Sequence, residues 1–390
     1  MKAKVRNSPF HPSIRRVCFV TGTRAEFGLM QTVLQTLRSQ TNLKFQLMVT
    51  GMHLHAEHGR SIDAIRKQGW KIDAVIPWKL KANPLPAEST GTAIAKMAHE
   101  FDRLKTDIVL VVGDRVEAFA AATAGHLSNR LVAHIHGGDR APGQVDDSLR
   151  HAITKLAHVH FPATLASAKR IRKLGEEQFR IHRAGSPGIE NVSQAAALSN
   201  EIVKQFPKVS PHQFALIVLH PITNEKFVEY ERAKSVLDAV WQAGVNQTIV
   251  VYPNNDPGAN QVIQCWCDHQ ERITYLLKDA ARPQFLGLLR DCAFLIGNSS
   301  AGIIEAASFG TPVLDVGSRQ QGRERSQNVT SVSYEPRALA RAIKRVWNNG
   351  KPRRWRGNNA YGGAGTANKI AGVLSRVPLD ARMLRKLIAY

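Results

Sequence analysis

Residues that can move protons gather in one short stretch in the first half of the chain. Two histidines, three aspartates and an arginine fall within eighteen residues: His134, His136, Asp139, Asp146, Asp147 and Arg150. Adjacent carboxylates crowd each other, so the pKa of one can rise toward neutrality, which suits general acid or base catalysis. A His-x-His pair with an aspartate could instead bind a metal, but the surrounding glycines do not complete a ligand set, and we expect no metal. We expect His134 and His136 to project from one face of a strand, and the stretch indicates proton-transfer chemistry.

Two other polar turns in the first half have the composition of a site, and each has a plainer alternative. Asp114, in the turn GDR, is placed where a catalytic carboxylate often lies, although it could simply cap the helix that follows. Arg24, in the turn TGTRAE, could hold a phosphate through its two-pronged guanidinium, or could be an ordinary surface arginine. Neither turn is a P-loop or a GxGxxG motif, so ATP hydrolysis and NAD binding have no support.

The second half carries the pattern of an anion site. The stretch GNSSAGIIEAASFG (297–310) lies between two apolar runs, which predicts the turn and helix of a βαβ unit. A helix N-terminus there favours an anion, and the hydroxyls of Ser299 and Ser300 can reach a phosphate. The plainer alternative is that Ser299 only caps the helix and Glu305 is solvated. Other polar residues at predicted strand ends in this half are His220, Asn254, Asn255, Asp256, Arg319 and Arg323.

The elements that must position these residues alternate between strands and helices in both halves. Near-continuous apolar runs such as DIVLVV (107–112) and CAFLI (292–296) predict parallel strands that are buried on both faces, with polar residues at their carboxyl ends. We therefore expect an α/β fold of two doubly wound, Rossmann-like domains facing a cleft. The expected segments are a flexible basic lead-in (1–15), an N-terminal domain with the carboxylates (16–185), a linker (186–212) and a C-terminal domain (213–390). An edge strand (179–185) would close the N-terminal domain. The C-terminal helix of the second domain could pack back on the first domain.

Composition narrows the class of protein. The chain has 390 residues, about right for two domains, and 43% of them are hydrophobic, as in globular proteins. No apolar run approaches the ~20 residues of a membrane span, and the basic N-terminus lacks the apolar core of a signal peptide. The four cysteines form neither a zinc nor a disulfide pattern. We expect a cytoplasmic protein with no membrane partner.

The formal net charge of +22 is unusual. It could indicate nucleic-acid binding, but the Lys and Arg residues are scattered and no nucleic-acid motif accompanies them. A basic surface on an enzyme that handles anionic substrates is the favoured explanation.

Taken in order, these segments resemble the UDP-N-acetylglucosamine 2-epimerase family, and most closely its hydrolysing branch from sialic-acid and legionaminic-acid pathways. The matching stretches run from about residue 16 to 372: VTGTRAEFG, VVGDRVEAFAAATAGHL, AHIHGGD, DDSLRHAITKLAHVHF, GSPGIENV, LHPITNE, VVYPNND, IGNSSAGIIEAASFGTPVLDVGSRQQGRERSQNV and NAYGGAGTANKIA. The resemblance implies a glycosyltransferase-B-like fold that binds UDP mainly through the C-terminal domain. It also implies a UDP-sugar substrate, a homodimer, and no need for a metal or NAD.

The resemblance implies roles for individual residues. Ser299 and Ser300 would contact the diphosphate and Glu305 the ribose, while Asp114 and Asp146 match carboxylates of the chemistry. His220 and Arg24 match diphosphate positions, and Arg323 matches an arginine of the nucleotide-side loop. The expected catalytic residues are Asp114, His136, Asp139, Asp146 and Asp147. The expected UDP-sugar contacts are Arg24, Arg115, Arg150, Glu190, His220, Asn254, Ser299, Ser300, Gly302, Glu305 and Arg323.

Three positions depart from the family pattern. His136 stands where many members carry a glutamate, Asp139 where the family often has a glutamate, and Glu190 where an aspartate is more usual. The first change puts the identity of one acid or base group in question. Histidine can perform the same proton transfer near neutral pH.

The implied reaction converts UDP-N-acetylglucosamine, or a UDP-2,4-diacetamido-2,4,6-trideoxy sugar, to UDP and the free 2-epimer. The C2 proton is removed as UDP leaves C1, giving a glycal; water then adds at C1 and a proton returns to C2 on the opposite face. A non-hydrolysing 2-epimerase would instead re-add UDP. A glycosyltransferase of the same fold class, a GDP-linked substrate, and a non-catalytic polyanion-binding protein stay open as alternatives.

Overall fold

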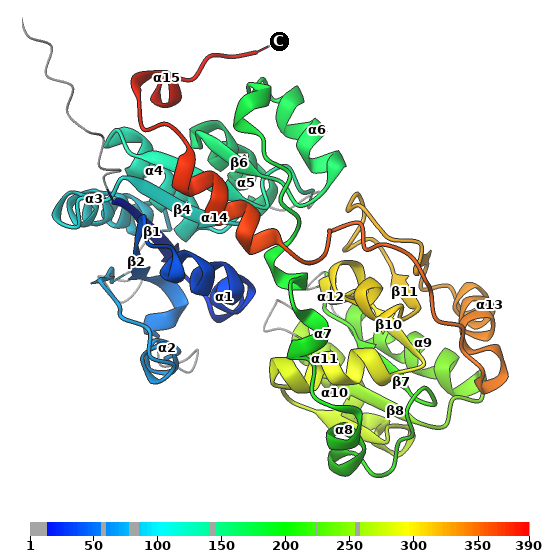
Figure 1. Ribbon diagram of the computed structural model, residues 1–390. Coiled ribbons are helices and arrows are strands. Elements are labelled where there is room, and N and C mark those ends of the chain that lie inside the picture. The colour runs from blue at the N-terminus through cyan, green and yellow to red at the C-terminus, as the bar shows by residue number, and fades with distance from the viewer. Residues whose placement is uncertain are drawn as a thin grey trace, which may run out of the picture. The chain divides into compact units, whose positions relative to one another are not determined.

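The structure of the chain, a computed structural model, describes residues 14–55, 60–77, 86–140, 145–222, 225, 227–253 and 258–389; for residues 86, 145 and 146 it describes the backbone only. The chain divides into two compact units (Figure 1). The first comprises residues 1–139, 143–187 and 365–390, and the second comprises residues 140–142 and 188–364.

The first unit is built on a six-stranded parallel sheet with the strand order β3-β2-β1-β4-β5-β6. Its strands are β1 (Arg15–Thr21), β2 (Leu43–Val49), β3 (Ala74–Val75), β4 (Ile108–Val112), β5 (Leu131–Ile135) and β6 (Val159–Phe161). The order of the strands reverses between β1 and β4. The turns after these two strands therefore meet at the carboxyl edge of the sheet, where ligands bind in doubly wound folds.

Helices cover both faces of this sheet, which is why its strands are apolar throughout. On one face α1 (Arg24–Ser39) and α14 (Thr366–Arg376) share a core with the strands. On the other face lie α3 (Pro86–Arg103), α4 (Val116–Leu127) and α5 (Val145–Leu156). Successive strand residues face opposite cores: Phe19 points to the first and Val20 to the second. This unit also contains α2 (Ile62–Lys67), α6 (Leu165–Lys173) and α15 (Ala381–Leu384).

The second unit repeats the same plan. Its sheet has the order β12-β11-β10-β7-β8-β9, again with all pairs parallel. The strands are β7 (Ala215–Val218), β8 (Thr248–Val251), β9 (Tyr275–Leu277), β10 (Phe294–Gly297), β11 (Val313–Val316) and β12 (Val329–Val332). The order of the strands reverses between β7 and β10, so the turns after these strands define the second ligand-binding edge.

Two helical layers enclose this second sheet. One face is covered by α9 (Val228–Gln242), α10 (Ala259–Asp268) and α13 (Pro336–Trp347), and the other by α8 (Ser199–Gln205) and α11 (Arg282–Asp291). The short helices α7 (Val192–Ala195) and α12 (Ser300–Ile304) also belong to this unit. The two parallel six-stranded sheets confirm the prediction of an α/β protein with two doubly wound halves.

The structure differs from the expected elements in three places. The stretch 179–185 is not a strand: residues 178–180 form a 3-10 turn and only Ile181 bridges to β6. The expected linker 186–212 holds α7 and α8, which pack against α11. The chain after residue 364 returns to the first unit, where Ile370 and Leu374 of α14 are buried in its core.

Two further observations concern membrane-spanning helices and the cysteines. No helix in the described part of the chain has the length and apolar character needed to cross a membrane. The four cysteines are free thiols; Cys18, Cys265 and Cys292 are buried and Cys267 is exposed.

Candidate active site

The first polar turn follows β1 and opens α1. Thr23 caps the helix, and the Glu26 carboxylate accepts hydrogen bonds from the backbone N–H of Gly22 at 2.8 Å and of Thr23 at 3.1 Å. Gly22 lies so close to Glu117 that a Cβ on it would sit 2.7 Å from that side chain. The turn is therefore fixed in shape, and Arg24 projects from the first turn of α1 as an exposed side chain.

The predicted proton-transfer residues meet around one buried arginine. Arg150, from α5, makes an ion pair with Asp114, which follows β4. Its Nη1 lies 3.8 Å from the Asp139 carboxylate and donates a hydrogen bond to the His136 carbonyl at 3.4 Å. The Arg150 side chain is only 4% exposed, so the charge of its guanidinium is held inside the protein beside these groups. The structure thus brings together four residues that the sequence separates by up to 36 positions.

His136 is the most tightly held member of this cluster. Its Nδ1 lies 2.9 Å from the Asp139 carboxylate and its Nε2 lies 3.0 Å from the Ser186 hydroxyl. A carboxylate can only accept, so Nδ1 carries the proton and a neutral ring accepts from Ser186 through Nε2. Asp139 is itself held by the Ser167 hydroxyl at 2.7 Å. The series Ser186–His136–Asp139–Ser167 can position an imidazole for proton transfer.

His134 does not share this environment, which corrects the expectation that His134 and His136 project from one strand face. The strand β5 ends at Ile135, and His136 adopts a left-handed backbone conformation with φ 62°. His134 stays in the sheet, fully buried, and its Nε2 donates to the Gly113 carbonyl at 2.7 Å. Burial lowers the pKa of His134 to about 3. His134 is therefore a neutral structural residue that joins the ends of β4 and β5.

Two other predicted residues of the first unit have partners of their own. Asp147 lies one helical turn from His151, with 3.7 Å between the carboxylate and the ring. Arg115 pairs with buried Glu117 at 3.3 Å. The side chain of Asp146 lies outside the described residues. In the described part of the chain, no three His, Cys, Asp or Glu side chains are arranged as metal ligands.

The second unit has its own polar site where β7 and β10 end. Asn298 links the two strands: its Oδ1 accepts from the His220 N–H at 2.7 Å and its Nδ2 donates to the His220 carbonyl at 2.8 Å. Gly297 precedes it with φ 145°, and a Cβ there would lie 2.0 Å from the Val218 carbonyl oxygen. Burial, together with the charge of Arg319, lowers the pKa of His220 to about 4, so this imidazole is neutral at pH 7.

The stretch that follows β10 forms the predicted turn and a short helix. Ser299 is the N-cap of α12, its hydroxyl accepting from the Ala301 N–H at 3.4 Å, and Ser300 beside it is partly exposed. Gly302 lets the helix approach the sheet, because a Cβ there would lie 2.9 Å from Val313. Gly302 therefore has a packing role in this structure.

Glu305 ends this helix and is paired. Its carboxylate lies 2.7 Å from Nη1 of Arg282, at the start of α11, and the Glu305 side chain is 12% exposed. Burial raises the pKa of Glu305, and the charge of Arg282 opposes that rise. The alternative of a solvated Glu305 is wrong: the carboxylate is buried and paired.

The loop after β11 is rich in arginine. Arg325 pairs with buried Asp315 at 2.9 Å, and Arg323, close by in the chain, is partly buried. A cavity of about 520 Å³ opens beside this loop, with Ser318, Gln321 and Arg325 in its lining. Glu190 is partly buried in the second unit, before α7. Asn254 lies outside the described residues.

A protein-family model described as UDP-N-acetylglucosamine 2-epimerase matches residues 35–375. The chain belongs to this family. The family assignment agrees with the resemblance drawn from the motifs, and it makes the chain a nucleotide-sugar 2-epimerase in broad class.

Individual relatives of this epimerase span nearly its whole length. It is 36% identical, over 97% of its chain and all of the relative, to the UDP-N,N'-diacetylbacillosamine 2-epimerase (hydrolyzing) of Legionella pneumophila. It is 33% identical to the UDP-N-acetylglucosamine 2-epimerase of Neisseria meningitidis, over 87% of its chain and 89% of that protein. The crystal structure of UDP-GlcNAc 2-epimerase from Neisseria meningitidis bound to UDP-GlcNAc matches with a TM-score of 0.79, at 20% identity, over 92% of this chain and 99% of that one. The epimerase thus has the glycosyltransferase-B-like fold.

Sequence reasoning missed several residues that shape the site. Arg282 was overlooked because α11 was not predicted, although its Pro at the second position is a helix-start signal. Asn298 and Ser186 stand inside quoted motifs, but nothing in their type or spacing shows that they hold His220 and His136. Ser167 looks like an ordinary small polar residue in the sequence, and only the fold brings it to Asp139.

Proposed function

We propose that this epimerase is a hydrolysing nucleotide-sugar 2-epimerase, which converts UDP-N-acetylglucosamine or a UDP-2,4-diacetamido-2,4,6-trideoxy sugar to UDP and the free 2-epimer. The observation that carries the proposal is the 36% identity over 97% of the chain to a relative named as a hydrolysing enzyme. A second such relative, named for GDP- and UDP-linked substrates, is 30% identical over 81% of the chain. The diacetamido sugar is therefore the first substrate to test beside UDP-N-acetylglucosamine.

The Arg150 cluster supports the proton-transfer part of this reaction. Removing a proton from C2 and returning one to the opposite face requires two groups on two sides of the sugar. Asp114 and His136 are the proposed pair. Asp114, held by its ion pair with Arg150, is the proposed base. His136, oriented by Asp139, can take or give a proton at Nε2, with the Ser186 hydroxyl as its neighbour.

The turns of the second unit support the departure of UDP. The negative charge that grows on the diphosphate needs donors that are fixed before the reaction. The proposed donors are the free N–H groups and hydroxyls around Ser299 and Ser300, the arginine of the loop at Arg323, and neutral His220, which can donate a hydrogen bond without a charge. Glu305, fixed by Arg282, is proposed to hold the ribose hydroxyls. All of these roles use groups of the chain itself.

The experiment that tests the assignment separates chemistry from binding. Asp114→Asn keeps the size of the side chain but removes the base, so turnover of the nucleotide sugar should fall by at least ~100-fold while UDP still binds in calorimetry. Asp102→Asn is the matched control, because Asp102 is an exposed aspartate that pairs with Arg130 on the surface. Full activity in Asp114→Asn would overturn the assignment of the Arg150 cluster.

A further inference from the structure

The C-terminal segment of the chain docks on the first unit with Met383 and Lys386 turned inward, whereas Leu387 and Ile388 are exposed. Lys386 is only 12% exposed, and its ammonium lies 2.7 Å from the carboxylate of Glu176. The same ammonium donates to the carbonyls of Thr154 at 3.3 Å and Lys155 at 2.7 Å. The next two residues, Leu387 and Ile388, are 70% and 59% exposed.

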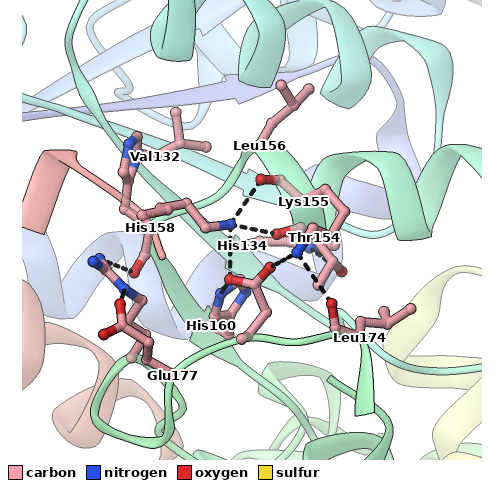
Figure 2. A network of polar contacts seen from close by, with 12 residues as sticks. Val132, His134, Thr154, Lys155, Leu156, His158, His160, Leu174 and Glu177 are labelled. Atoms are coloured by element: carbon pink, nitrogen blue, oxygen red, sulfur yellow. Dashed lines mark hydrogen bonds and ion pairs between the residues drawn. The ribbon is translucent and has the colours of Figure 1, made fainter. Parts of the chain in front are cut away.

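A buried polar network fixes this arrangement. Glu176 is 1% exposed and also binds Lys155 at 2.7 Å and the ring of His160, a residue of β6, at 3.0 Å (Figure 2). The Glu176 carboxylate and the two carbonyls offer one acceptor for each of the three hydrogens of the Lys386 ammonium. The ammonium is therefore hydrogen-bonded inside the protein without water.

A second anchor holds the preceding helix. Buried Arg180 donates to the carbonyls of Arg382, Met383 and Arg385, three residues in and after α15. Farther along, the Ala389 N–H donates to the Gly175 carbonyl at 2.9 Å, which ties the end of the segment to the loop after α6. The segment is therefore held at both ends, and Leu387 and Ile388 are presented outward by the fold.

The surroundings of these two residues are basic. Arg382 and Arg385 on the segment, and Arg172 and Lys173 at the end of α6, are exposed. In the part of the chain that the structure describes, no ion pair joins any of the four to a carboxylate. Phe179, 40% exposed, lies between Arg180 and Arg382, whose guanidinium carbons are 4.8 and 5.1 Å from its ring centre. We call these seven residues the C-terminal patch: Arg172, Lys173, Phe179, Arg382, Arg385, Leu387 and Ile388.

The residue types of the C-terminal patch favour an anionic membrane over a second copy of the chain or a nucleic acid as its partner. Aliphatic side chains flanked by exposed cations fit a surface that offers negative charge above an apolar interior, which is an anionic lipid bilayer. A second copy of the chain placed patch to patch would bring four cations against four, which repels. Single-stranded nucleic acid needs free aromatic faces, and Phe179 already stacks on two arginines of the chain.

We propose that the C-terminal patch is a peripheral membrane contact, through which Leu387 and Ile388 enter the headgroup region of an anionic bilayer while the four cations bind lipid phosphates. This contact requires no spanning helix, and it replaces the expectation of no membrane partner that the sequence alone suggested. It also gives part of the net charge of +22 a role beside the binding of anionic substrates. The proposal is independent of the proposed reaction.

The test is co-sedimentation of the purified full chain with vesicles rich in phosphatidylglycerol, compared with vesicles of phosphatidylcholine alone. The wild-type protein should bind the anionic vesicles and lose that binding as salt rises. Arg382→Gln with Arg385→Gln should weaken binding roughly thirtyfold, because each cation near an anionic surface is worth about 1 kcal/mol. Leu387→Ser with Ile388→Ser should weaken it as well, with the charge unchanged. Both variants keep Lys386 and Arg180, so the segment stays docked.

The matched control is Arg341→Gln with Arg345→Gln, which removes two exposed cations from α13 in the second unit. This pair should leave most of the vesicle binding in place. Equal loss in the control would mean that charge alone acts and would overturn the proposal. So would no binding to anionic vesicles, a change of oligomeric state in the Leu387/Ile388 variant by light scattering, or a preference for RNA over vesicles in direct competition.

Discussion

At the scale of single residues, the candidate chemistry depends on contacts that the sequence does not display. The two histidines of the HIHGGD stretch look equivalent in the sequence, yet β5 ends between them. One is a fully buried structural residue and the other is held between Asp139 and Ser186. Residue types and their order along the chain predicted the cluster; the roles within it depend on where the strand ends and on the left-handed turn at His136.

Asp139→Asn tests whether the hydrogen bond to Nδ1 matters for proton transfer. The amide could donate to Nδ1 and so favour the wrong tautomer of His136, and we expect kcat to fall by roughly 10²–10⁴-fold. UDP affinity, measured by calorimetry, should change little. Ser167→Ala removes only one partner of the Asp139 carboxylate and should have a smaller effect on kcat. Equal losses in the two variants would point to a collapsed site instead of a tautomer effect.

Arg282→Ala tests the buried pair at Glu305. Without Arg282, burial raises the pKa of Glu305 further, so the carboxylate is lost as a ribose acceptor as pH falls. A charge-assisted hydrogen bond is worth about 1.5–3 kcal/mol, which predicts a rise in KM of roughly 10- to 100-fold with little change in kcat. Arg290→Ala, on the same helix but paired with Asp291, is the control. If KM for the nucleotide sugar rises equally in both variants, the assignment of Glu305 is wrong.

At the scale of elements, the strands were easier to predict than the helices. Fully buried parallel strands read as continuous apolar runs, and β4 and β10 were found for that reason. The helices α10 and α11 were missed because their apolar residues are spaced among polar ones within about three turns. β12 was missed because it is an edge strand of four residues, VTSV, with two polar members. The stretch 179–185 has strand-like residues, but it begins in the 3-10 turn of residues 178–180, which contains Arg180.

Gly297→Ala tests the close approach of β10 to β7. The added Cβ would lie 2.0 Å from the Val218 carbonyl oxygen, so backbone must move and the Asn298 link to His220 must break. We expect a loss of more than ~3 kcal/mol in unfolding free energy, measured by urea denaturation. Gly244→Ala is the control for backbone strain without a steric clash. Gly244 has φ 75° but no atom within 4 Å of an added Cβ, so this change should lower the unfolding free energy by only about 1–2 kcal/mol. Similar costs for the two changes would contradict this reading.

At the scale of the whole molecule, each unit is an independent doubly wound sheet with a polar carboxyl edge, but the chain does not divide at one point. Residues 365–390 return to the first unit, a return that we expected as a possibility for the C-terminal helix but did not include in the boundary of the second domain. The reason is physical: α14 carries an ordinary amphipathic pattern, and nothing in that pattern says which sheet it covers. The buried side chains Ile370 and Leu374 settle the question in favour of the first core.

The Glu176 network predicts how stability depends on pH. Burial alone would raise the pKa of Glu176, but the hydrogen bond from His160 and the charges of Lys386 and Lys155 more than offset this and lower it to about 2. A depressed carboxylate pKa stabilises the fold above the unfolded-state value near 4.5, and that stability is lost as pH falls from there toward 2. This pH-dependent contribution of Glu176 to the unfolding free energy is about 3 kcal/mol at neutral pH.

Glu176→Gln is the variant that isolates this effect. Glutamine cannot ionise, so the difference in unfolding free energy between wild type and variant should be large at neutral pH and shrink as pH falls from 4.5 toward 2. Chemical denaturation at several pH values measures the difference directly. A difference that stays constant over this range would show that Glu176 is not held ionised by its partners.

The central claim is that the epimerase eliminates UDP and releases a free sugar, and proton NMR in deuterated buffer tests it most directly. The enzyme is incubated with UDP-N-acetylglucosamine or with the UDP-diacetamido sugar, without metal and without an acceptor. The account predicts UDP and a free 2-epimer that carries deuterium at C2. A nucleotide-linked 2-epimer at equilibrium, with no free sugar, would contradict the hydrolysing assignment, and product without deuterium at C2 would contradict the proton-transfer role of the Arg150 cluster.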